Sequence, residues 1–421
     1  MKVFNLPEGW KFVSLYDLVD VIGGVSYSPE DITSSGVRVI RGGNIQGNLV
    51  ELRDDDVFLP DTYKNSDNSL HKGDVILVAS TGSVEALGRT ATVWENMENV
   101  QIGAFLRILR PKQPKYAALV SAWLSSEHYF RYIRLVAKGT SINNISLNHI
   151  KGFKIPIPSD EKATSFTALY NAVAKKININ RAINQNLEAL AKQIYDYWFV
   201  QFDFPNEEGK PYKSSGGKMV YNKTLKREIP KGWGDGKLID IANITMGQSP
   251  DGSSYNKDGD GVIFYQGSTD FGIRFPEVRQ YSTAPTRFAN KGDILMSVRA
   301  PVGAINFANN DCCIGRGLCA MNSKIGSVTH LYHTICVFKE KFERASQIGT
   351  TFGSITKDEL YSLPVVIPHE SIVSKYERLC SPIFDRQMGL GVESVHLTSL
   401  RDYLIPLLMN GQVTIKEYNQ I

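Results

Sequence analysis

Residues 139–199 read GTSINNISLNHIKGFKIPIPSDEKATSFTALYNAVAKKININRAINQNLEALAKQIYDYWF. The stretch predicts a Gly-Thr loop, a short helical turn, an apolar strand and then a long polar helix with an apolar stripe. The same order returns 210 residues later without a gap, in residues 349–411, which read GTTFGSITKDELYSLPVVIPHESIVSKYERLCSPIFDRQMGLGVESVHLTSLRDYLIPLLMNG. Single identities, such as Gly139 with Gly349, are weak evidence. The unbroken register predicts that the chain contains two copies of one unit.

Both long helices carry apolar residues at heptad spacing. This pattern predicts an a/d seam between two paired helices rather than a helix lying on a globular core. The alternative of two unrelated amphipathic helices, each buried in its own domain, remains open. We expect Pro382 and Pro406 to bend or interrupt the second helix, because an internal proline removes a backbone hydrogen bond. The predicted seam residues are Phe166, Leu169, Val173, Ile183, Leu187, Leu190 and Ile194, and then Tyr376, Leu379, Ile383, Leu390, Leu397, Leu400, Leu404 and Leu407.

Length and composition limit the protein classes to consider. A chain of 421 residues predicts two to three domains. The net charge of +4 is too small to indicate a nucleic-acid partner, because clustering of Lys and Arg on one face matters more. No apolar run approaches the roughly 18 residues of a membrane helix, and the first ten residues do not resemble a signal peptide. We therefore expect a cytoplasmic protein.

Cysteine and histidine usage indicates neither disulfides nor a metal. The five cysteines form no Cys-x-x-Cys pair, which argues against a disulfide framework and a zinc site. His330 and His333 have helical spacing but no third ligand at a telling distance in the sequence. We expect buried, reduced thiols and no metal.

The remaining sequence predicts a strand-rich front part in each copy. The copies open with LPEGW at 6–10 and IPKGW at 229–233, and matched strands follow: 37–45 with 261–269, 72–78 with 291–297, and 101–106 with 313–318. The expected fold class is α+β, with two tandem domains of mixed strands and helices, each followed by a long helix. The predicted segments are 1–158 (first domain), 159–200 (first helix), 201–228 (linker), 229–368 (second domain), 369–411 (second helix) and 412–421 (tail).

A helix over 117–138, answered by 329–347, carries a basic pair in each copy. Arg131 and Arg134 match Lys341 and Arg344, and three-residue spacing places each pair on one helix face. Each pair is either an ordinary solvated face or a phosphate clamp presented twice.

Sequence motifs for catalysis are missing. The chain has no G-x-x-x-x-G-K-[ST] loop, and it has no Pro-Pro and therefore no Asn/Asp-Pro-Pro-aromatic motif of a base methyltransferase. The stretch from Asn256 to Gly261 copies the first half of a calcium loop, but Gly267 stands where a bidentate Glu is needed. No Ser/His/Asp grouping stands out. The pattern favours a binding protein.

The duplicated set LPEGW and IPKGW, KGDVIL and KGDILM, KIPIP and VVIP, with the junction YDYWFVQFDFPNEEGKPYKSSGGKMVYNKTLKREIPKGW, resembles the specificity subunit of type I DNA restriction-modification systems. The resemblance covers essentially the whole chain. It implies two target recognition domains that each read half of a split, asymmetric DNA site. It also implies antiparallel helices that act as a spacer and carry two modification (methyltransferase) subunits, which restriction subunits join. Catalysis, with S-adenosylmethionine, ATP and Mg²⁺, then belongs to the partner subunits, and this chain has no cofactor.

Candidate DNA contacts follow from this resemblance, because Arg reads guanine and Asn or Gln reads adenine in the major groove. Two alternatives stay open: a fused DNA methyltransferase or nuclease with an unrecognised motif, and a repeat scaffold that binds only protein. The expected DNA-binding residues are Arg41, Asn44, Gln46, Arg131, Arg134 and Thr140 in the first copy, and Gln266, Thr269, Arg274, Arg299, Lys341, Arg344 and Thr350 in the second.

Overall fold

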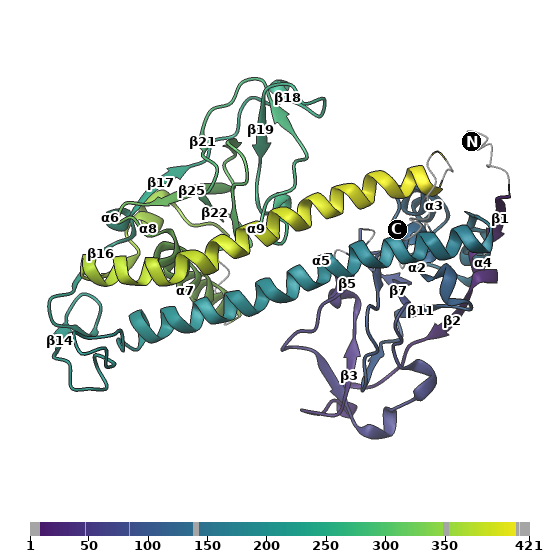
Figure 1. Cartoon of the computed structure of the whole chain (residues 1–421), viewed down its shortest axis with the longest axis horizontal. Coiled ribbons are helices and arrows are strands. Elements are labelled where there is room, and N and C mark those ends of the chain that lie inside the picture. Colours follow the sequence, from purple (N-terminus) through teal and green to yellow (C-terminus); the bar gives the residue numbers. More distant parts are fainter. Residues whose placement is uncertain are drawn as a thin grey trace, which may run out of the picture. The chain divides into compact units, whose positions relative to one another are not determined.

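The computed structural model describes residues 9–46, 48–83, 85–137, 143–347, 353–409 and 412. The chain divides into two compact units (Figure 1). The first contains residues up to Asn178 together with those from His396 onward, and the second contains Ile179–Val395. Each long helix therefore contributes one part to each unit.

The first domain runs from β1 to β13 and lies in the first unit. Its main sheet has the order β2-β11-β7-β9, and a smaller sheet has the order β10-β3-β6. The elements are β1 (Lys11–Ser14), α1 (Leu15–Leu18), β2 (Val19–Gly23), η1 (Pro29–Asp31), β3 (Val37–Ile40), η2 (Gly42–Asn44), β4 (Ile45–Gln46), β5 (Leu49–Val50), β6 (Val57–Leu59), η3 (Asp61–Tyr63), η4 (Ser66–Asn68), β7 (Val75–Val78), β8 (Ser80–Thr81), β9 (Thr90–Thr92), β10 (Val100–Ile102), β11 (Leu106–Pro111), η5 (Pro114–Tyr116), α2 (Ala117–Leu124), α3 (Glu127–Val136), β12 (Asn143–Asn144), α4 (Leu147–Gly152) and β13 (Lys154–Ile157).

The second domain runs from β16 to β26 and lies in the second unit. Its main sheet has the order β17-β25-β22-β23, and the other sheet has the order β18-β20-β19-β24-β21. The elements are β16 (Gly234–Lys237), α6 (Leu238–Ile241), β17 (Ala242–Met246), η7 (Gly252–Ser254), β18 (Tyr255–Asn256), β19 (Val262–Tyr265), η8 (Ser268–Asp270), β20 (Tyr281–Ser282), β21 (Phe288–Ala289), β22 (Ile294–Ser297), β23 (Ile305–Phe307), β24 (Cys312–Ile314), β25 (Leu318–Ser323), α7 (Val328–Gln347), α8 (Lys357–Tyr361) and β26 (Pro364–Ile367).

The two domains share the topology and strand register of their main sheets, which confirms the predicted duplication. In each, the first and last strands pair antiparallel, as β1 with β13 and β16 with β26. In each, a parallel pair joins β3 to β10 or β19 to β24. The central pairs have the same register, since Val19 faces Pro111 and Ala242 faces Ser323.

A pair of glycines allows two backbone segments to meet in each domain. A Cβ on Gly24 would lie 2.2 Å from the carbonyl oxygen of Gly103, and a Cβ on Gly247 would lie 2.2 Å from that of Gly315. Any side chain at Gly24 or Gly247 would therefore push the segments apart. The same steric requirement has been kept in both copies of the fold.

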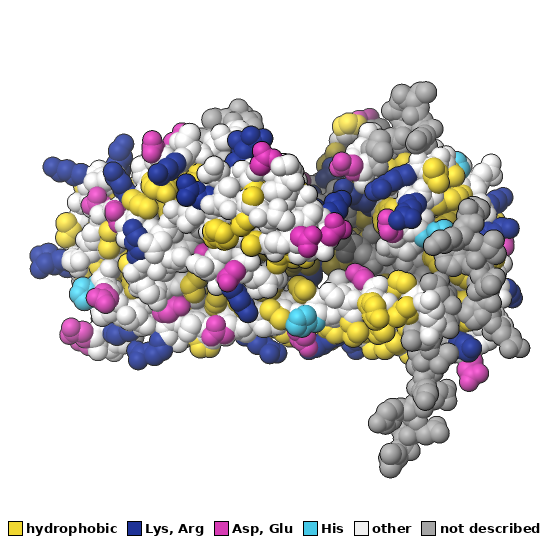
Figure 2. Space-filling model, turned by 90° about the horizontal axis from the view of Figure 1, so that it is seen from above, with side chains coloured by type: hydrophobic (Ala, Val, Ile, Leu, Met, Phe, Trp, Pro, Cys, Tyr) yellow, Lys and Arg dark blue, Asp and Glu magenta, His cyan; other side chains and the backbone are white. Residues whose placement is uncertain are grey.

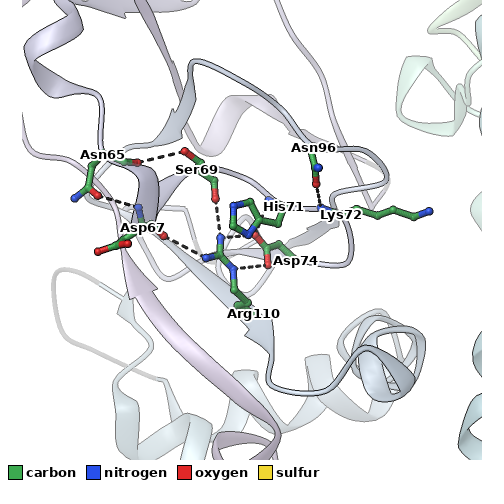
Figure 3. A network of polar contacts seen from close by, with 8 residues as sticks. All are labelled: Asn65, Asp67, Ser69, His71, Lys72, Asp74, Asn96 and Arg110. Atoms are coloured by element: carbon green, nitrogen blue, oxygen red, sulfur yellow. Dashed lines mark hydrogen bonds and ion pairs between the residues drawn. The ribbon is translucent and has the colours of Figure 1, made fainter.

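The Lys-Gly-Asp turns that were expected to begin a strand do so, and each is fixed by its aspartate. The amide of His71 donates to Asp74 Oδ2 at 2.8 Å, and the guanidinium of Arg110 grips both carboxylate oxygens at 3.0 and 2.9 Å (Figure 3). In the second domain the amide of Asn290 donates to Asp293, and the side chain of Asn322 takes the place of the guanidinium. The turn is common to both domains, but only the first domain pairs the aspartate with a cation.

The long helices α5 (Asp160–Tyr195) and α9 (Glu370–Met409) pair antiparallel. In the second unit, Glu188 accepts a hydrogen bond from Gln387 at 2.8 Å, and Asn180 donates to Glu393 at 2.9 Å, so residue numbers rise on one helix as they fall on the other. In the first unit, the core that contains Phe166 also packs against Ile405 and Leu408.

The second helix is not interrupted, which excludes one of the two effects expected of its prolines. α9 is continuous across Pro382 and Pro406, both of which are exposed. The carbonyls that lose their hydrogen bond belong to Arg378 and Asp402, which are also exposed, so water can satisfy them.

The predicted seam is right in one column and displaced by one residue in the other. The column through Phe166 and Tyr376 is buried or half-buried, whereas Leu169, Leu190, Leu379 and Leu400 are exposed. The second column of buried or half-buried residues is instead Tyr170, Ile177, Asn184 and Ala191 in α5 with Trp198 in η6 (Asp196–Val200), and Cys380, Gln387, Ser394, Arg401 and Leu408 in α9. Counting apolar residues favoured the leucines, because the true column contains polar side chains that bond across the seam, such as Gln387.

The segment 201–228, which was expected to be a linker, has a defined fold. After a π-helical turn, η6 (Asp196–Val200), Phe202 and Phe204 are buried, and Phe204 stacks on Trp233 with ring centroids 4.9 Å apart. A hairpin of β14 (Met219–Asn222) and β15 (Arg227–Pro230) follows. The polar composition of the segment predicted a linker, although its few aromatic residues are buried. Among the described helices, none combines the length and apolar character of a membrane span.

Candidate nucleic-acid interface

Three strand ends of the first domain meet at one edge. The parallel strands β3 and β10 end at Ile40 and Ile102, and the amide of Gly103 donates to the carbonyl of Ile40 at 2.9 Å. The turn from Gly103 to Phe105 is bound in addition to the end of β7, because the amides of Ala79 and Ser80 both donate to the carbonyl of Phe105 at 3.0 Å.

The described end of the Gly-Thr loop joins this edge through β12. Ser80 and Thr81 of β8 pair antiparallel with Asn144 and Asn143. We call residues 41–44, 80–81, 103–105 and 143–144 the first strand-end cluster. It brings together four loops that are far apart in the sequence.

The second domain builds the same cluster from the equivalent strand ends. The amide of Gly315 donates to the carbonyl of Tyr265 at 2.8 Å, and the amide of Val298 donates to that of Gly317 at 2.9 Å. The backbones of Arg299 and Ser354 form an isolated antiparallel β-bridge, which places the end of the second Gly-Thr loop at this edge as well. Residues 266–270, 298–299, 315–317 and 354 form the second strand-end cluster.

Arg41 and Gln266 occupy the same place in the two clusters. Arg41 directly follows β3 and Gln266 directly follows β19, and both are exposed. Their backbone amides donate to the side chains of Asn44 and Asp270, at 2.8 and 2.7 Å, which cap the short turns that follow. The fold therefore presents a guanidinium in one domain and a carboxamide in the other.

Comparison with known proteins identifies the family. The model of the type I restriction modification DNA specificity domain matches residues 7–189 and 230–377. The chain belongs to this family. Its two matched domains fit a role in recognising DNA sequence.

Individual relatives agree with this assignment. The chain is 27% identical to a protein described as a type I restriction enzyme MjaX specificity subunit of Methanocaldococcus jannaschii, over 99% of this chain and 96% of the relative. It is 21% identical to the HindI specificity subunit of Haemophilus influenzae, over 77% of this chain and 84% of the relative. The crystal structure of the S subunit of a type I system from M. genitalium shares the fold, with 15% identity, a TM-score of 0.53 and 97% of each chain covered.

Asn44 of the first specificity domain supports the fold and is not available to a base. It is 2% exposed, and its amide group donates to the carbonyl of Glu51 at 2.8 Å and to Asp56 Oδ1 at 2.5 Å. Both amide hydrogens are used, the oxygen accepts from the amide of Arg41, and burial keeps the rest of the side chain from a base edge. The prediction that Asn44 reads DNA is therefore corrected.

Arg274 of the second specificity domain is likewise a structural residue in this fold. Its side chain is 11% exposed and donates to Glu188 of α5 at 2.9 Å. Glu188 also accepts from Tyr332 and Gln387. Burial alone would raise the pKa of Glu188, but the Tyr332 hydrogen bond and the charge of Arg274 together hold it below its ordinary value. Arg274 ties its domain to the helix pair within the second unit, which no sequence pattern revealed.

The other predicted contacts stay predictions, and their residues are exposed: Gln46, Arg131, Arg134, Thr269, Arg299 and Lys341. Arg131 forms an ion pair with Glu127 at 2.6 Å, one helical turn earlier. Thr140 and Thr350 lie outside the described residues, as does the side chain of Arg344.

Sequence reasoning missed residues in the turns of the clusters. Phe105 and Asn144 in the first cluster and Arg316 in the second are exposed there. The matched stretches QIGAFL and CIGRGL contained the signal, since the residues after each Gly occupy a turn directly after a strand.

One group among the described residues has metal-ligand chemistry. The ligand atoms of Glu188, His333 and Cys336 lie within 4.8 Å of one another. Glu188 is already committed to three donors, including a guanidinium that would repel a cation. Burial also raises the pKa of the Cys336 thiol to about 12, which disfavours the thiolate that a metal needs. We assign no metal to this group.

A cavity of about 340 Å³ lies in the first unit beside the Lys72–Asp74 turn, lined partly by Ser121 and Tyr170. Its charged groups are Lys72, Asp74 and Arg110, of which the last two bond each other. Lys72 is exposed, and a single lysine does not define a ligand, so we assign no site there.

Proposed function

We propose that this chain is the non-catalytic DNA-recognition subunit of a type I restriction-modification complex, with each specificity domain reading one half of a split, asymmetric site. The observation that carries the proposal is the duplicated strand-end cluster with Arg41 in one copy and Gln266 in the other. An Arg side chain forms paired hydrogen bonds with guanine, and a Gln side chain forms them with adenine. Because equivalent positions of the two domains carry side chains that bind different bases, we expect the two half-sites to differ in sequence.

The exposed leucines of the long helices support a partner that binds twice. Leu169 and Leu379 are equivalent by the internal repeat, as are Leu190 and Leu400, and all four are exposed. The antiparallel pairing therefore gives the first unit Leu169 with Leu400 and the second unit Leu379 with Leu190. Figure 2 shows hydrophobic side chains gathered over the part of α9 in the first unit. Unpaired apolar groups of this kind mark interaction sites.

We assign these leucines to two copies of the modification subunit. That subunit supplies the methyltransferase with its S-adenosylmethionine, and restriction subunits supply the chemistry that uses ATP and Mg²⁺. The role of this chain is to bind DNA and to hold the partners beside it. Methylation or cleavage of DNA by the purified chain alone would contradict the non-catalytic assignment.

The decisive experiment is methylome sequencing of cells that carry the operon with wild-type, Arg41→Gln or Gln266→Arg chains. We expect a bipartite methylated motif in the wild type. Arg41→Gln should change only one half and Gln266→Arg only the other, with discrimination between bases of roughly 5- to 150-fold. Arg131→Gln is the control, because a phosphate contact should lower methylation without changing the motif. A variant that alters both halves, or neither, would argue against the assigned readers.

The helices should set the spacing of the two half-sites. The seam repeats every seven residues, so inserting seven residues near Asn184 and near Ser394 preserves its phase. Each helix then lengthens by about 10 Å, and the unread gap should grow by up to about three base pairs. Efficient methylation at the original spacing would show that the helices do not determine it.

A further inference from the structure

Phe105 has an unusual combination of a fixed backbone and an exposed ring. It ends the turn between β10 and β11, and the residue is 70% exposed. A large apolar side chain in water is common on a surface, but here it lies in the strand-end cluster, two residues after Gly103, whose amide donates to the carbonyl of the residue before Arg41.

The turn that carries Phe105 is held from several sides. The carbonyl of Phe105 accepts hydrogen bonds from the amides of Ala79 and Ser80, and the amide of Leu106 donates to the carbonyl of Gly103 at 2.9 Å. The guanidinium of Arg107 folds over the turn and donates to the carbonyls of Ala104 and Leu106, at 2.8 and 2.7 Å. The ring is therefore displayed by a rigid segment, which lowers the entropy lost when a partner binds it.

We propose that Phe105 inserts at a base step of the half-site read by the first domain and stacks on the exposed face of a base. This inference rests on the proposed DNA-reading function. The ring offers an apolar face for stacking, and Arg41 and Arg107 beside it carry the positive charge that phosphates require. Exposed Phe and Leu side chains commonly act as wedges in this way in proteins that kink DNA.

The second domain lacks the wedge for a steric reason. Gly317 takes the place of Phe105, and a Cβ there would lie 2.7 Å from the carbonyl oxygen of Gln266. The preceding residue is Arg316, where the first domain has Ala104. The second cluster thus has a cation one residue before the position at which the first has an aromatic ring, and it has no ring there, so base unstacking is confined to one half-site.

The test uses the full chain and short duplexes that carry the motif it selects from a random duplex library. 2-Aminopurine replaces one adenine at a time in either half-site, because its fluorescence reports unstacking. The wild type should change the fluorescence at one step of the first half-site only. Phe105→Ala should abolish that change and weaken binding by about tenfold, and Phe105→Trp should retain both.

Phe12→Ala is the matched control, since Phe12 is 48% exposed on β1 and lies outside the cluster. It should leave binding and fluorescence unchanged. If the wild type selects no motif, the proposed function itself fails. If it selects a motif that Phe105→Ala binds equally well with the same fluorescence change, only the wedge is overturned. Loss of assembly with the modification subunit at unchanged DNA affinity would assign Phe105 to a protein contact and overturn it as well.

Discussion

The two specificity domains share their backbone, but they stabilise it differently at one buried turn. Asp74 is almost fully buried and is gripped by the guanidinium of Arg110, whose own pKa is raised by that hydrogen bond. Asp293 at the equivalent turn accepts from the neutral side chain of Asn322. The shared feature is a carboxylate that accepts a backbone amide at the turn. The turn therefore requires the acceptor, and the nature of its second partner can vary.

The largest expected effect comes from removing that second partner. Arg110→Ala leaves a buried carboxylate without its cation and should destabilise the first unit by about 3–5 kcal/mol. Asn322→Ala removes a neutral hydrogen bond and should cost the second unit about 1 kcal/mol. Hydrogen exchange measured by mass spectrometry resolves the two domains separately. Equal losses would mean that the ion pair contributes no more than the amide.

The glycine contacts should instead give equal effects in both domains. Gly24→Ala and Gly247→Ala each place a Cβ against a carbonyl oxygen and should each cost about 2–3 kcal/mol. Gly23→Ala is the control, because nothing lies within 4 Å of its added Cβ. The same exchange measurement applies. A domain that tolerates its substitution would not need the close approach that both copies show.

Acid should weaken the second unit through two buried histidines. Burial, with a smaller effect from His333, lowers the pKa of His330 to about 3, and burial lowers that of His333 to about 4. The unfolded chain takes up these protons below about pH 6.5 and the folded chain does not, so stability falls as pH drops from 6.5 towards 4. Each histidine should cost about 1 kcal/mol between pH 7.5 and 5.5.

Urea unfolding at the two pH values checks this loss. His333→Gln should remove about half of the pH dependence of the second unit, whatever it does to stability at pH 7.5. His71→Gln, on an exposed turn of the first domain, should leave that dependence as it is. A second unit equally stable at both pH values would contradict the assignment.

The smallest effects concern the basic helix faces. If Arg131 and Lys341 contact phosphates, changing either to Ala should reduce the slope of log affinity against log salt by about one. Stability should hardly change, because the exposed pair of Arg131 with Glu127 contributes little. Fluorescence anisotropy with duplex DNA at several salt concentrations measures the slope. Lys210→Ala, in the segment between the domains, is the control, and a slope change in one domain alone would show that the faces are not equivalent.

Much of the fold was predictable because the sequence contains an internal repeat. The unbroken register from Gly139 and from Gly349 predicted two equivalent domains and two long helices, and the strands begin where the Lys-Gly-Asp turns indicated. One seam column was right and the other was displaced, because heptad counting favours leucine, whereas the polar residues Asn184 and Gln387 are half-buried and buried, respectively, in the seam. A count of apolar residues places leucines in the seam and amides outside it, which is the reverse of what this column shows.

The candidate site was predicted less well, for a related reason. Arg41 and Gln266 are exposed, although the guanidinium of Arg41 donates to the carbonyl of Asp55 at 3.1 Å, and their contact with DNA stays a prediction. Asn44 and Arg274 were chosen by the same reasoning, but their side chains are bonded within the fold. Residue type decides what hydrogen bonds a side chain can form. It does not decide whether those bonds are already taken by a partner far along the chain.

By itself, the sequence determined the duplication, the strand and helix order and the family, since these depend on local patterns and on similarity between matched stretches. Only the tertiary structure decided which polar side chains face solvent. Asp56 and Glu188 reach Asn44 and Arg274 across 12 and 86 residues and commit them to the fold, whereas the bonds around Gly103 fix the turn that leaves Phe105 outside. Packing between distant segments sets that division, because a buried polar group must find its partner wherever the fold brings one.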